Sequence, residues 1–76
     1  MKVYRHRRSE KGPRFTIASP SGKRPAKHPG EPLALIEAQR EAERSEDPIT
    51  VRVVDEEVVL FTVTKNEAGH VLTWAT

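Results

Sequence analysis

Residues 49–64, ITVRVVDEEVVLFTVT, decide the fold of this chain. Two runs rich in β-branched residues, 49–54 and 58–64, flank a short acidic turn formed by Asp55, Glu56 and Glu57. β-Branched side chains favour extended backbone, and two such runs joined by a short turn are typical of an antiparallel hairpin. The stretch therefore predicts two adjacent strands with carboxylates at the turn between them.

A third strand is predicted at the C-terminal end, after the turn signal NEAG at residues 66–69. In HVLTWAT, residues 70–76, alternation places His70, Leu72 and Trp74 on one face and the intervening residues on the other. Trp74 is most simply a core or sheet-face residue, and a stacking platform or a protein-binding anchor is the alternative. The last third of the chain thus predicts a three-stranded antiparallel meander.

The segment before the meander has helical character from Pro32 to about Glu46, where Asp47-Pro48 ends it. An apolar stripe on the helix is expected to lie on the sheet. Its expected members are Leu33, Leu35, Ile36, Gln39 and Ala42. Acid and base pairs three residues apart are expected on the other surface.

The N-terminal part predicts a hairpin whose arms are residues 3–8 and 14–19, joined by the turn SEKG at 9–12. Phe15 and Ile17 alternate with polar residues on the second arm, which gives it one buried face. Residues 23–28 are expected to form a third, irregular strand. Pro25 confines that strand to a sheet edge, because proline has no N–H to donate.

The predicted fold class is α+β, a single small domain over residues 1–76 with one helix packed across an antiparallel sheet. The chain has no cysteine, so neither disulfides nor thiolate zinc sites are expected. The first residues are too polar for a signal peptide, and no apolar run approaches the ~20 residues that cross a bilayer. These features predict a cytoplasmic protein that does not contact membranes.

Charge divides the chain into two halves. Residues 1–29 hold nine Lys or Arg and one acid, Glu10, a net charge of +8, whereas residues 30–76 hold four bases and ten acids, a net charge of −6. Nucleic acid, an acidic protein surface and the acidic half of the same chain are all suitable partners for the basic half.

Catalytic and metal-binding motifs are not apparent. His6, His28 and His70 are expected in three different elements, without the spacing of a metal site. For nucleophilic catalysis, the Ser and Thr residues lack a nucleophile elbow, a glycine-rich oxyanion loop and a general base at a suitable spacing. The prediction is a protein that is not an enzyme and needs no cofactor or metal.

The basic residues are therefore the candidate site, and phosphate contact is the expected mode of nucleic-acid binding. The candidate residues are Arg5, Arg7, Arg8, Lys11, Arg14, Lys23, Arg24 and Lys27. Two other interpretations stay open: a charged hairpin that protects a sheet edge from aggregation, and bases that neutralise the acidic half.

Residues 4–44 resemble the arm-type DNA-binding module of phage and transposon tyrosine integrases. The likeness rests on a basic strand, KGPRFTI at 11–17, a turn ending GKR at 22–24, and the helix EAQREAE at 37–43. The resemblance implies that a sheet face contacts DNA through Arg5, Arg7, Arg14 and Thr16, with Lys23 and Arg24 at the turn. It also implies a phage or mobile-element setting.

An alternative hypothesis is a protein-interaction module, or a small inhibitor or regulator, that binds a larger protein through the edge of the C-terminal meander. The uncharged strand at the C-terminus, with Leu72 and Trp74, has an edge that can extend the sheet of a partner protein. A homodimer formed through the same edge is a variant of this hypothesis.

Overall fold

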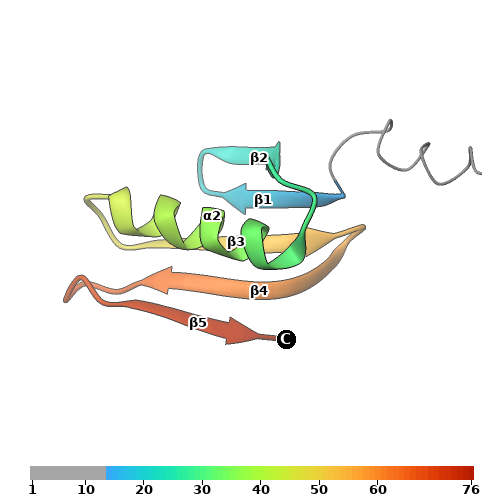
Figure 1. Cartoon of the computed structure of the whole chain (residues 1–76). Helices are drawn as coiled ribbons and strands as arrows, with labels where there is room; N and C mark the ends of the chain where they lie inside the picture. The colour runs from blue at the N-terminus through green and yellow to red at the C-terminus, as the bar shows by residue number, and fades with distance from the viewer. Residues whose placement is uncertain (1–13) are drawn as a thin grey trace, which may run out of the picture.

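Within residues 14–76, one helix lies on one face of a five-stranded sheet (Figure 1). The computed structural model describes residues 14–76, in the order β1 (Phe15–Ser19), β2 (Gly22–Pro25), α2 (Glu31–Arg44), β3 (Ile49–Asp55), β4 (Val58–Lys65) and β5 (Val71–Ala75). The strand order is β2-β1-β3-β4-β5, and every neighbouring pair is antiparallel. The predicted α+β class, the helix and the C-terminal meander are confirmed.

The N-terminal hairpin is built from β1 and β2, with Ile17 opposite Arg24. The other edge of β1 pairs with β3, where Ile17 lies opposite Val53. Both edges of β1 are thus occupied, so the expected pairing of residues 3–8 with residues 14–19 is wrong; residues 3–8 themselves lie outside the described part of the chain. The third, irregular strand of the prediction is β2, an edge strand as expected. It spans Gly22–Pro25 and is therefore shorter than the predicted residues 23–28.

Alanines form the helix face that meets the sheet. Ala34, Ala38 and Ala42 are fully buried at every fourth position, and they pack with Ile17 and the valines of β3 and β4. The prediction of the helix stripe was partly wrong. Ala42 and the partly buried Leu35 do belong to the core, as predicted.

The two largest residues of that expected stripe lie elsewhere: Leu33 and Ile36 are 47% and 42% exposed. Small side chains allow the helix backbone to approach the sheet closely, which explains why alanines occupy the contact. Gln39 lies beside the core and donates a hydrogen bond from its Nε2 to the Thr73 hydroxyl at 3.1 Å.

The acidic turn predicted between β3 and β4 is confirmed, and it consists of Glu56 and Glu57. Both residues have positive φ, 51° and 81°, as expected for a two-residue hairpin of type I′. A register shift between Val53 and Val54 bends the pair just before this turn. The turn carries its carboxylates away from the centre of the sheet.

Candidate nucleic-acid interface

The sheet has two unlike faces, which the strand register defines. The helix face carries Phe15, Ile17, Val51, Val53 and Val63, all buried beneath α2. The opposite face, here called the open face, has no helix or strand of residues 14–76 packed over it. Its members follow from alternation and pairing: Thr16, Ala18, Lys23, Pro25, Thr50, Arg52, Val54, Val59, Thr62, Thr64, Leu72 and Trp74.

Five residues of the open face form one continuous row across all five strands. Lys23 pairs with Ala18, Ala18 with Arg52, Arg52 with Thr62, and Thr62 with Trp74. We call Lys23, Ala18, Arg52, Thr62 and Trp74 the cross-strand row. Because neighbouring strands lie about 4.8 Å apart, the backbone positions of Lys23 and Arg52 are roughly 10 Å apart, and so are those of Arg52 and Trp74.

Trp74 is half exposed, with 53% of its surface accessible, and Leu72 on the same strand is 45% exposed. Lys23 and Arg52 are also exposed. An exposed tryptophan on a sheet surface is unusual, since its large apolar area normally finds a partner. The row therefore offers an aromatic ring and two positive charges to a ligand.

Carboxylates are absent from the open face among residues 14–76. Those of the acidic half lie on α2, in the segment after it, or in the turns at the ends of the meander. Asp55, at the end of β3, accepts hydrogen bonds from Nε and Nη2 of Arg14 at 3.1 and 2.8 Å. Among residues 14–76, the sheet thus separates a helix side with an excess of carboxylates from an open face whose charged side chains are all basic.

The structure distributes the predicted nucleic-acid residues over different places. Lys23 lies on the open face and Lys27 is exposed in the loop before α2. Arg14 is held by Asp55, although 53% of its side chain stays exposed, and Arg24 points to the helix. Four predicted residues fall outside the described part of the chain: Arg5, Arg7, Arg8 and Lys11.

Arg52 was missed by sequence reasoning, although the sequence carried a signal for it. In ITVRVVD, the alternation that buries Val51 and Val53 places Arg52 on the opposite face. Trp74 was predicted first as a core or sheet-face residue, with a stacking platform or a protein-binding anchor as the alternatives. None of these predictions related it to Arg52, because that relation depends on the pairing of β4 with both β3 and β5.

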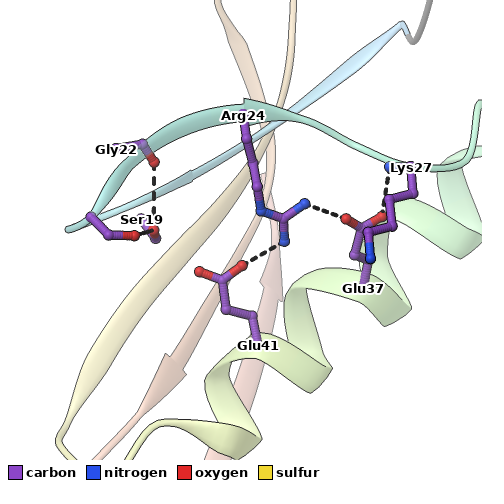
Figure 2. A network of polar contacts seen from close by, with 7 residues as sticks. Ser19, Gly22, Arg24, Lys27, Glu37 and Glu41 are labelled. Carbon is purple, nitrogen blue, oxygen red and sulfur yellow. Dashed lines mark hydrogen bonds and ion pairs between the residues drawn. The ribbon is translucent and has the colours of Figure 1, made fainter.

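Arg24 joins β2 to the helix through two carboxylates. Figure 2 shows its guanidinium between Glu37 and Glu41. Nη1 donates to Glu37, and Nη2 donates to Oε1 of Glu41 at 2.6 Å. The backbone N–H of Lys27 donates a further bond to Glu37 at 2.9 Å. Hydrogen bonds to both carboxylates raise the pKa of Arg24 above its ordinary value. Within the chain, this base does neutralise the acidic helix, as one alternative interpretation expected.

The same contacts make Glu37 sensitive to acid. Burial opposes its ionisation, but the hydrogen bonds from Arg24 and Lys27 outweigh that penalty and lower its pKa. A lowered folded-state pKa means that the unfolded chain binds the proton first, so this stabilisation exists above about pH 4.3 and is lost as the pH falls through the folded value.

We therefore expect acid to unfold the wild type more steeply than Glu37→Gln in urea titrations between about pH 5 and pH 2. Glutamine keeps a hydrogen-bond acceptor but cannot titrate, so the variant should lose less stability over this range. Arg24→Gln should flatten the pH dependence in the same way, because it removes the partner that lowers the pKa. Equal slopes for wild type and both variants would contradict the role given to this cluster.

Metal chemistry finds no support in residues 14–76, where no three His, Asp or Glu side chains converge as ligands. Within this range, no helix combines the length and apolarity needed to cross a membrane. Comparison with known proteins gave no matching family model, no curated protein and no solved structure. The candidate site therefore rests on the geometry of the chain itself.

Proposed function

We propose that this protein binds single-stranded nucleic acid on its open face and acts by binding, without catalysis. The observation that carries the proposal is the cross-strand row, in which Lys23, Arg52 and Trp74 share a sheet face that no other element of residues 14–76 covers. Proteins that bind single strands combine cations that track the phosphates with aromatic rings on which bases stack. The row supplies both kinds of group, and Thr62 adds a hydroxyl between them.

Trp74 is the proposed stacking residue. Its indole is the largest accessible aromatic side chain among residues 14–76, and its partner on β4 is the small residue Thr62. Stacking of one base on an aromatic side chain is worth about 1–3 kcal/mol. Such contacts tolerate any base, so we expect weak sequence preference.

Arg52 and Lys23 are the proposed phosphate contacts. Both are exposed, and no carboxylate in the described part of the chain is bonded to either side chain. Their charges thus remain available to a ligand, unlike that of Arg24. The acidic helix on the other face would repel a polyanion, which favours approach from the open face.

The width of the sheet favours a single strand over a duplex. Five strands at about 4.8 Å spacing span roughly 19 Å, whereas the major groove of B-DNA is about 12 Å wide. A duplex could then meet only part of the row. The likeness of residues 4–44 to an integrase arm module, which implies duplex DNA, stays a prediction.

The test is fluorescence anisotropy of a labelled 30-nucleotide oligothymidine, titrated with the full chain at 50 and 200 mM salt. We expect Trp74→Ala to weaken binding about tenfold or more. Arg52→Ala should make the plot of log affinity against log salt shallower by about 0.7, the loss of one phosphate contact. Arg40→Ala is the matched control, because Arg40 is an exposed arginine on α2.

The proposal fails if Trp74→Ala and Arg52→Ala bind as wild type does, or if Arg40→Ala is as damaging as Arg52→Ala. Circular dichroism must show that each variant keeps its fold. Stronger binding to a 30-base-pair duplex than to the single strand would shift the function to duplex DNA.

A protein partner is the second candidate function, and the outer edge of β5, which is unpaired among residues 14–76, favours it. β5 pairs with β4 on one side, and no strand of residues 14–76 pairs with its other side. Leu72 and Trp74 lie on this edge strand with large exposed areas. Binding to a partner protein with no affinity for either oligonucleotide would favour this candidate.

A further inference from the structure

The two edges of the sheet are protected to very different degrees. On β2, the bond from the Ala26 N–H to the Phe15 carbonyl at 2.9 Å fixes which residues face β1. By alternation, the backbone polar groups of Lys23 and Pro25 point away from β1, to the outer edge of the sheet. A proline at an outward position and a neighbouring lysine both oppose the addition of another strand. β5 has neither device, since VLTWA contains no charge and no proline.

The outward backbone groups of β5 are identified by two hydrogen bonds at its ends. The Asn66 N–H donates to the His70 carbonyl at 3.0 Å, and the Thr76 N–H donates to the Leu60 carbonyl at 2.9 Å. Even-numbered residues of β5 thus bond to β4. Val71, Thr73 and Ala75 direct their N–H and C=O groups to the outer edge, where no described residue meets them.

We propose that this edge binds a second copy of the chain, with β5 pairing antiparallel to its own equivalent about a two-fold axis at Thr73. In this register Thr73 lies opposite Thr73 of the second copy, and Val71 opposite Ala75. All three outward residues of each strand then occupy hydrogen-bonded positions. A shift of two residues in either direction leaves fewer of them paired, so the strand is most complementary to itself in this register.

The side chains fit the same register. Leu72 of one copy lies opposite Trp74 of the other at non-hydrogen-bonded positions, where facing side chains are closest. Each of these residues has about half its surface exposed in the single chain, so the pairing brings together two apolar groups that otherwise face water. The pairing also requires an uncharged strand. A two-fold axis would bring a charge near the centre of one strand close to the same charge on the other strand.

The dimer would be a continuous ten-stranded antiparallel sheet with both helices on one face and both open faces on the other. It places two cross-strand rows, each ending in Trp74, next to each other. The inference does not depend on the proposed function, because it concerns the free protein and is tested without nucleic acid.

The test is sedimentation velocity of the full chain from about 5 to 500 µM, where we expect a shift from 8.6 kDa to twice that mass. Thr73→Pro removes an outward N–H and the hydroxyl that accepts from Gln39, but no backbone hydrogen bond within the single sheet. The dimer loses two bonds at its axis. Its dissociation constant should rise roughly 30-fold. Thr73→Lys, which places two like charges at the axis, should also favour the monomer.

Amide hydrogen exchange identifies the surface independently of folding defects in the variants. At the higher concentration, the amides of Val71, Thr73 and Ala75 should become protected, while those of Leu72 and Trp74 are protected at both concentrations. A wild type that stays monomeric at 500 µM overturns the inference. So does a dimer that persists in both Thr73 variants, or one that leaves the three outward amides unprotected.

Discussion

Ile17→Ala is expected to lower the free energy of unfolding by about 2–5 kcal/mol. Ile17 is 1% exposed and lies on β1 between β2 and β3, beneath the helix. Its loss removes buried methyl groups and leaves a cavity that the surrounding valines fill only in part. A domain of this length has a total stability of roughly 4–11 kcal/mol, so the variant should be near its unfolding limit at room temperature.

Urea denaturation followed by circular dichroism at a few µM protein measures this loss without a contribution from association. Val58→Ala is the control, because Val58 is 59% exposed on β4. It should cost under about 1 kcal/mol, the span of β-propensity effects. Equal losses in the two variants would contradict the position of the core between the helix and the central strands.

Ala38→Leu is expected to destabilise the domain by about 1–3 kcal/mol, although leucine is a good helix former. Ala38 is fully buried where α2 lies on the sheet. Three extra carbon atoms there must displace the helix or force side chains away from their preferred rotamers. The same urea experiment measures the effect.

Ile36→Ala is the informative companion, because the pattern of the sequence assigned Ile36 to the core. Its side chain is 42% exposed on the outer side of the helix, so this change should cost under about 1 kcal/mol. If Ile36→Ala were the more damaging of the two, the helix would lie on the sheet by the face that the sequence predicted, and the observed alanine face would be wrong.

Local patterns were sufficient to predict the elements but not how they meet. The meander followed from β-branched runs and turn signals, and the edge position of β2 followed from Pro25. The pairing of β1 with β3 could not be predicted in this way. The alternation of Phe15 and Ile17 with polar residues fitted a local hairpin with residues 3–8 equally well. A long-range pairing is decided by which faces can share one core, and that information is spread over the whole chain.

The helix face was only partly predicted for a related reason. A hydrophobic pattern weights large apolar residues, so Leu33 and Ile36 outweighed alanines in the expected stripe. A helix that lies close to a sheet instead selects for small residues at its centre, as Ala34, Ala38 and Ala42 show.

The candidate site was predictable in its charge but not in its geometry. The excess of bases in residues 1–29 suggested phosphate binding, yet Arg24 is committed to the helix by Glu37 and Glu41. The cross-strand row combines residues 23, 52 and 74, which come from opposite halves of the chain. No local motif could have joined them, because their alignment requires four strand registers to be known at once.

The most direct test of the open face uses Trp74, the single tryptophan of the chain. Its emission reports on the open face, and stacking with a base should quench it. A few µM protein keeps association through β5 from contributing to the signal. In a titration with oligothymidine at 50 mM salt, we expect quenching that saturates together with the anisotropy of the labelled strand and is reversed by added salt. Unchanged tryptophan emission while the anisotropy rises would place the nucleic acid elsewhere on the protein and contradict the open face as its binding site.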